Sequence, residues 1–184
     1  WGGTGWEQGF RVVAMVAAFG VMVYSGFVLA YPSAIAFWNN PLLPVLFVVY
    51  ALMGGLGIIF ALLRAWQPTT PQVQMLVAVE IWFIASAAIL MAFYLLTMFN
   101  STAGARRATQ RLLRGELALP FIGGVVGLGL AVPLGLALYS YFSGLSQTTA
   151  WIVLLAAGIL ELAGGFLFRY TFIKAGTYGP LLEG

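Results

Sequence analysis

Two glutamates inside long apolar stretches are the residues of this chain best placed to do chemistry. Glu80 lies in the apolar segment 73–98, and Glu161 lies in the segment 150–171. An ionised carboxylate is costly in hydrocarbon, so each side chain is expected to be protonated, paired or turned toward a wet cavity. At about 1.5 Å per helical residue the two acids lie roughly 10 Å and 16 Å from one membrane face, a spacing that fits a proton relay. The alternative is a structural hydrogen bond or ion pair between helices.

Tyr24 is a third candidate, because it lies deep in the apolar segment 12–36 and nearer to the opposite membrane face. Ser25 and Gly26 follow it and form a polar, narrow patch on an otherwise apolar helix. A small aromatic ligand can lie on such a patch and accept a hydrogen bond from the tyrosine hydroxyl at its carbonyl group. The alternatives are an interfacial anchor and a packed ring whose hydroxyl bonds a neighbour.

The composition of the chain shows that membrane helices must position these side chains. The 184 residues are 62% hydrophobic and only 7% charged, and their mean hydropathy is +1.00. A soluble domain carries about a quarter charged residues. The chain has neither cysteine nor histidine, so it holds no iron–sulfur cluster, structural zinc or histidine-ligated haem of its own. Its net charge of +3 is typical of membrane topology or docking, and nucleic acid is not expected as a partner.

Five segments are long and apolar enough to cross the ~30 Å hydrocarbon layer as helices of about 20 residues. The sequence places them at residues 12–36, 43–63, 73–98, 118–142 and 150–171. Their apolar runs do not alternate as strands of a barrel would, so we expect an all-α integral membrane protein. We treat residues 1–184 as a single transmembrane domain. Gly123 and Gly127 have the spacing of a close helix contact, and Pro133 is predicted to kink the fourth helix.

The odd number of spans puts the two chain ends on opposite faces of the membrane. One face, here called the arginine face, holds the uncharged corner 37–44 with Asn39 and Asn40, and the connection 100–116. The other is called the N-terminal face. Four arginines lie in that connection: Arg106, Arg107, Arg111 and Arg114. The excess of positive charge predicts that the arginine face is cytoplasmic.

Several motifs of this chain resemble the polysulfide reductase NrfD family. The most specific are Tyr24-Ser25-Gly26 and the run FWNNPLLPVLF at 37–47, and similar matches at 115–118 and 161–165 extend the resemblance over nearly the whole chain. Members of this family have about eight helices, and the five segments resemble helices four to eight. The chain begins without methionine, so we expect upstream helices to be absent from it, together with part of the quinone pocket.

The resemblance implies a quinone-binding membrane anchor subunit in the prokaryotic cytoplasmic membrane, without haem. Such a subunit exchanges electrons between a quinone, menaquinone or ubiquinone, and a four-cluster, ferredoxin-like iron–sulfur subunit. A molybdopterin subunit, or another catalytic or cytochrome subunit, often completes the complex. The resemblance implies that Tyr24, with Ser25 and Gly26, lines the quinone pocket, and that the two asparagines and four arginines dock the iron–sulfur subunit. It also implies a periplasmic arginine face, against the charge rule.

Two other functions stay open at this point. In a transporter or channel, the buried acids would carry an ion or a solute, although the internal repeats and broken helices common in transporters are not clearly visible. In a purely structural anchor, the protein would hold its partners without a quinone site.

Overall fold

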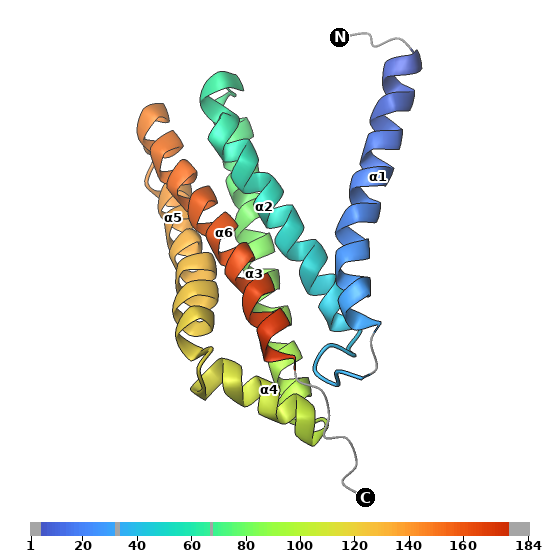
Figure 1. Ribbon diagram of the computed structural model, residues 1–184. Helices are drawn as coiled ribbons and strands as arrows, with labels where there is room; N and C mark the ends of the chain where they lie inside the picture. The colour runs from blue at the N-terminus through green and yellow to red at the C-terminus, as the bar shows by residue number, and fades with distance from the viewer. Residues whose placement is uncertain (1–4, 32–33, 67, 177–184) are drawn as a thin grey trace, which may run out of the picture.

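The computed structural model describes residues 5–31, 34–66 and 68–176, and this part of the chain is helical without any strand (Figure 1). Its elements are α1 (Gly5–Ala30), α2 (Leu42–Trp66), α3 (Thr70–Phe99), α4 (Ala103–Arg114), η1 (Leu119–Ala131), α5 (Val132–Phe142) and α6 (Gln147–Ala175). Five helices in it are long and apolar enough to cross a membrane, since η1 and α5 form one continuous span, Leu119–Phe142. The predicted all-α, five-span class is confirmed.

The first span differs most from its prediction. Residues 12–36 were expected, whereas α1 begins at Gly5 and ends at Ala30; residues 32–33 of the predicted span lie outside the described residues. A proline at position 32 explains the early end, because the residue before a proline disfavours helical backbone. Hydropathy alone missed this stop, since the chain stays apolar beyond it.

Helices α2, α3, α6 and the η1–α5 span form a bundle, and α1 leans away from it (Figure 1). Gly26 is the one residue of α1 that is buried. A Cβ atom there would collide with the Cα of Pro44 and lie 3.2 Å from the Cβ of Phe47. The close approach of α1 to α2 therefore depends on this glycine, at the end of α1 next to the arginine face.

Helix α6 crosses two neighbours at glycine-to-glycine contacts. A Cβ atom on Gly158 would lie 2.8 Å from the Cα of Gly57 in α2, and one on Gly129 would lie 2.6 Å from the Cα of Gly164. Glycines thus bring helix backbones together, as transmembrane packing favours. The predicted pair was wrong, however, because Gly123 is exposed and makes no such crossing.

The fourth span changes helix type next to its proline. The segment η1 is a wide π-helix, and at its end the backbone N–H of Val132 bonds the carbonyl of Gly127. From Val132 onward the chain is α-helical, with Pro133 in the first turn of α5. Proline has no N–H to continue the hydrogen bonds of a helix. The hydrogen-bond pattern therefore changes next to Pro133, where the sequence predicted a kink.

The connection 100–116 contains a helix that the search for spans missed. Helix α4 is capped by Thr102, whose hydroxyl accepts from the backbone N–H of Ala105 at 3.3 Å. It lies across the arginine-face end of the bundle (Figure 1). Its buried residues follow helical spacing: Ala105, Ala108, Thr109 and Leu112. The signal was present in the sequence, but twelve residues are too few for a membrane span.

Two groups of apolar side chains fill the bundle. The aromatic cluster lies toward the arginine face and includes Phe37, Tyr94, Phe121, Phe168 and Phe172. The smaller group, here called the apolar plug, lies toward the N-terminal face and comprises Phe60, Leu63, Val77, Ala137 and Leu154. The two groups divide the interior along its length.

The corner between α1 and α2 folds back into the aromatic cluster. Phe37 is 1% exposed, and its ring lies 5.4 Å from that of Tyr94 and 5.5 Å from that of Phe172. The hydroxyl of Tyr94 donates to the carbonyl of Phe37. The indole N–H of Trp38 donates to the carbonyl of Phe172 at 2.9 Å. The corner therefore closes the end of the bundle with Phe37 and Trp38.

Candidate functional site

The structure brings Glu80 of α3 and Glu161 of α6 together in the middle of the bundle. They are 0% and 3% exposed, and their carboxyl groups lie within hydrogen-bonding reach of each other. With both groups taken as ionised, neither carboxylate has a hydrogen-bond partner among the described residues. Two ionised carboxylates only accept hydrogen bonds, so the pair can bond only when a proton lies on one of them. The arrangement fits a shared proton.

The acid pair lies at the boundary between the two apolar groups. On α3, Glu80 stands between Val77 of the apolar plug and Ile84 of the larger core. On α6, Glu161 stands between Leu154 of the plug and Phe168 of the aromatic cluster. No basic side chain of the described residues bonds either acid, so no ion pair within this part of the chain accounts for the two glutamates.

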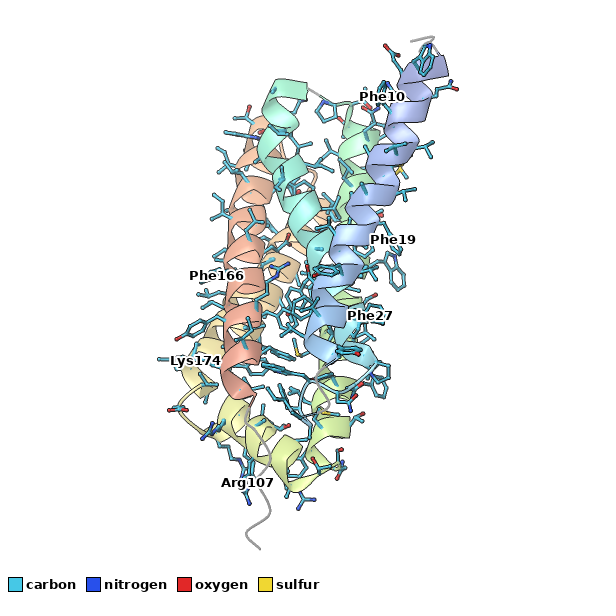
Figure 2. The ribbon with its side chains drawn as sticks, turned by 45° about the vertical axis from the view of Figure 1, so that its right-hand side comes forward. Phe10, Phe19, Phe27, Arg107, Phe166 and Lys174 are labelled. Carbon is cyan, nitrogen blue, oxygen red and sulfur yellow. The ribbon has the colours of Figure 1, made fainter. Side chains whose placement is uncertain are left out.

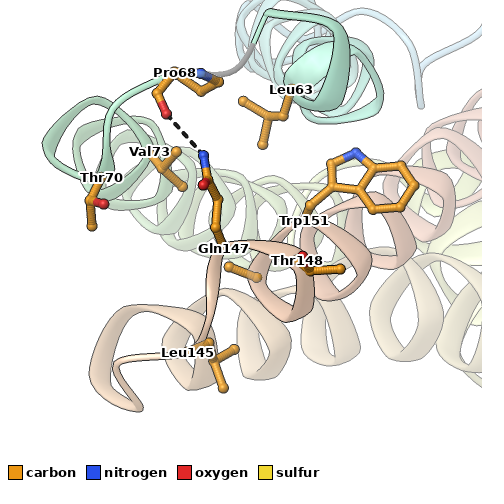
Figure 3. Close-up of a pocket in the computed structure, with 9 residues that line it drawn as sticks. Leu63, Pro68, Thr70, Val73, Leu145, Gln147, Thr148 and Trp151 are labelled. Atoms are coloured by element: carbon orange, nitrogen blue, oxygen red, sulfur yellow. Dashed lines mark hydrogen bonds between the residues drawn. The ribbon is translucent and has the colours of Figure 1, made fainter.

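A cavity of about 400 Å³ opens at the N-terminal face, above the apolar plug (Figure 3). Its polar rim includes Thr70, Thr148 and Gln147, whose amide donates to the carbonyl of Pro68 at 3.4 Å. The described residues that line it are Leu63, Pro68, Thr70, Val73, Leu145, Gln147, Thr148, Ala150 and Trp151. Val73 lies about two helical turns before Glu80 on the same helix, so the plug separates the cavity from the acid pair.

Tyr24, Ser25 and Gly26 occupy three different surroundings. Tyr24 is 70% exposed on the outside of α1. The hydroxyl of Ser25 donates to the carbonyl of Val21 at 3.1 Å, and Gly26 is closed by Pro44. None of the three lines the cavity at the N-terminal face or the groove between α3 and α4. Of the three, Tyr24 is therefore the residue that presents an open polar group on this helix.

The surface of α1 around Tyr24 is apolar and open. Phe10, Phe19 and Phe27 are exposed along its length (Figure 2). Only 6% of its most apolar stretch is buried, against 39% for α2 and for α6. Such a face is stable against lipid chains or other apolar helices and not against water.

The four arginines predicted to dock a partner are all exposed on α4. Arg106 donates from Nε to the carbonyl of Phe99 at 3.0 Å, and its guanidinium lies 5.5 Å from the centre of the Phe99 ring. Lys174 lies toward the same end as Arg107 (Figure 2). The arginine face is therefore strongly basic in the part of the chain that the structure describes.

The two corner asparagines differ. Asn39 is exposed, whereas Asn40 is 5% exposed. The side-chain oxygen of Asn40 accepts from the backbone N–H of Leu42 at 2.9 Å and so supports the start of α2. A docking contact at this corner therefore depends on Asn39.

Tyr50 is a buried polar residue that the sequence analysis did not select. Its ring stacks on Phe168 at 4.2 Å and 4°. A Cβ atom on Gly165, about one helical turn beyond Glu161, would lie 3.8 Å from this ring. The hydroxyl of Tyr50 is buried without a hydrogen-bond partner among the described residues. Its position in the apolar segment 43–63 is the signal in the sequence that could have indicated it, as it did for Tyr24.

The NrfD polysulphide reductase family matches residues 5–179 of this chain. Among curated proteins, the C subunit of the polysulfide reductase of Wolinella succinogenes is 30% identical over 172 residues, which cover 90% of this sequence and 53% of that protein. Protein NrfD of Escherichia coli strain K12 is 27% identical over 174 residues, covering 92% and 53%. The chain thus spans about half the length of these curated relatives. No solved structure matches it.

Proposed function

The chain belongs to the NrfD polysulphide reductase family, and on that premise we propose that it is a quinone-binding membrane anchor subunit of a respiratory oxidoreductase complex. The similar protein of Wolinella succinogenes is named as one part of a reductase, which supports a role within an assembly. The proposed place is the prokaryotic cytoplasmic membrane. In this role the protein exchanges electrons between a partner subunit and the quinone pool.

The proposed electron partner is a four-cluster, ferredoxin-like iron–sulfur subunit bound at the arginine face, with a catalytic subunit, such as a molybdopterin subunit, beyond it. Helix α4 carries four exposed arginines and no acidic residue. An acidic surface on the partner would complement this charge, which favours rapid and oriented association. Asn39 stands exposed at the same end and is the corner residue available for the contact.

Of the three residues expected to bind quinone, Tyr24 is the one whose surroundings are compatible with that role. Its hydroxyl stands exposed on an apolar helix face, where it can donate a hydrogen bond to a quinone carbonyl. Ser25 and Gly26 make internal contacts, so this protein supplies one wall of such a site. When bound there, a quinone takes up two electrons and two protons on reduction.

The acid pair is the observation that carries the proposed proton relay. Glu80 and Glu161 are buried, face each other and lack a basic partner among the described residues. A proton shared by two carboxyl groups passes between them without creating a separated charge in the apolar core. The cavity at the N-terminal face supplies water next to the plug, and transient hydration of the plug would join the two.

Replacing Glu161 by glutamine tests the relay in the intact complex reconstituted in vesicles. We expect quinone-linked turnover to fall about tenfold or more, because general acid–base groups contribute at least that much. Electron transfer from the partner to a water-soluble acceptor should stay unchanged. Glu116→Gln is the matched control, since Glu116 is exposed. Full turnover in Glu161→Gln would make the acid structural.

Replacing Tyr24 by phenylalanine tests the quinone site separately. We expect a higher KM for quinone with assembly of the complex intact, because the change removes one hydroxyl. Tyr139→Phe is the control, as Tyr139 is exposed on another helix. Unchanged quinone kinetics would remove Tyr24 from the site. A complex that shows no quinone turnover in any form would favour the transporter or the structural anchor.

A further inference from the structure

A second cavity, an open groove of about 540 Å³, lies between the end of α3 and the amphipathic helix α4. Helix α3 contributes Ala92, Leu95, Leu96 and Phe99, and α4 contributes Gln110, Leu113 and Arg114. The lining is apolar except for Gln110 and Arg114, which both come from α4. The groove is thus apolar along the membrane helix α3 and polar along α4, which lies across the end of the bundle.

The position of the groove exposes it to lipid. Leu96 and Phe93 are among the exposed apolar side chains of α3, so this side of the helix is an outer face of the described bundle. The apolar length of α3 crosses the hydrocarbon layer, and α4 begins a few residues after it ends. An amphipathic helix at that depth lies at the boundary between acyl chains and head groups.

Arg114, the charged residue of the groove, has no ion-pair partner in the described part of the chain. Arg106 bonds the carbonyl of Phe99, but Arg114 has no hydrogen bond, ion pair or ring contact there. Helix α4 contains no aspartate or glutamate. A guanidinium group binds a phosphate with well-directed hydrogen bonds, and a basic pocket beside membrane helices is a recognised form of anionic lipid site.

We propose that this groove binds an anionic phospholipid, with an acyl chain along α3 and the phosphate at Arg114 and Gln110. The combination of lining and charge selects this occupant. A free phosphate would leave the apolar length of the groove unfilled, and a zwitterionic lipid would bring a cationic group of its own close to Arg114. The site does not depend on the proposed quinone chemistry, and Arg107 and Arg111, which do not line the groove, stay available to a protein partner.

Native mass spectrometry of the purified, delipidated complex tests the site with phosphatidylglycerol and phosphatidylcholine as probes. We expect one tightly held phosphatidylglycerol per copy of this protein and weaker binding of phosphatidylcholine. Arg114→Gln should weaken phosphatidylglycerol binding about fivefold, the effect of one basic residue at a membrane surface. Arg111→Gln removes the same charge from the same helix outside the groove lining and should leave the tight site in place.

A substitution in the apolar lining of the groove provides a second test of lipid binding. Ala92→Phe fills the apolar part without changing any charge, and we expect it to lower the occupancy of both lipids. Equal weakening by Arg114→Gln and Arg111→Gln would overturn the proposal, because it would mean general attraction to α4. So would unchanged lipid binding in Arg114→Gln and Ala92→Phe. Loss of a protein subunit with unchanged lipid binding in Arg114→Gln would assign the groove to that subunit instead.

Discussion

The α2–α6 bundle encloses its acidic side chains, whereas α1 displays its tyrosine on the outside. Glu80 and Glu161 are surrounded by four spans that pack through glycine contacts and two apolar groups. Tyr24 stands on a helix that meets the bundle at Gly26. Both acids of the proposed relay are therefore enclosed by the described helices, whereas the tyrosine of the proposed quinone site lies open on the outside. The difference predicts that damage to the bundle and damage to α1 have separate consequences.

The largest effect is expected from a change at the crossing of α6 and η1. Gly164→Leu places a side chain where the Cα of Gly129 lies, so the two backbones must separate. We expect a loss of about 3 kcal/mol of stability from such overpacking, seen as a lower unfolding temperature in detergent and a low yield of folded protein. Gly135→Leu is the control, because nothing lies within 4 Å of that position. Equal stability of the two variants would mean that the bundle is not held by this crossing.

An intermediate effect is expected where α1 joins α2. Gly26→Leu should release α1 while the bundle stays folded, because the new side chain collides with Pro44. The chain has no cysteine, so spin labels on cysteines introduced at Phe10 and Ile58 can report the distance between the two helices. We expect a broader distance distribution in Gly26→Leu and an unchanged one in Gly20→Leu, where the added side chain meets nothing. Unfolding of the whole protein by Gly26→Leu would contradict the separation of α1 from the bundle.

The smallest effect is expected at Ser25, which the sequence analysis grouped with Tyr24. Its hydroxyl bonds the carbonyl one turn earlier in its own helix, so Ser25→Ala should change stability by no more than about 0.5 kcal/mol. Quinone turnover should also stay at the original rate. A clear rise in KM for quinone in Ser25→Ala would restore Ser25 to the binding site and would show that its hydroxyl turns away from Val21 when a quinone binds.

The sequence predicted the number of spans, because this number follows from hydropathy. It could not predict that the acids face each other, since that depends on how each helix is rotated. The rotation of α6 is set by the contacts of Gly158 with Gly57 and of Gly164 with Gly129, and such pairs are not visible as a spacing within one segment. The predicted glycine pair, Gly123 and Gly127, failed for this reason.

The structure of the connections between the spans could not be predicted from the sequence either. The corner 37–44 reads as an uncharged turn, and nothing in its composition indicates that Phe37 enters the core. That packing needs the rings of Tyr94 and Phe172, which come from helices far away in the chain. Likewise, α4 was predicted as a connection because it is too short to span a membrane, although its apolar positions follow helical spacing.

The path of the corner into the aromatic cluster has a thermodynamic consequence. Asn39 is exposed and Phe37, two positions earlier, is held inside the bundle by Tyr94. A partner that docked at Asn39, as proposed, would also restrain Phe37, so docking and internal packing would share a coupling free energy. Such coupling is reciprocal: a loosened aromatic cluster must weaken docking by the same factor by which docking tightens the cluster. The packing of the bundle interior would in this way respond to the proposed docking at its surface.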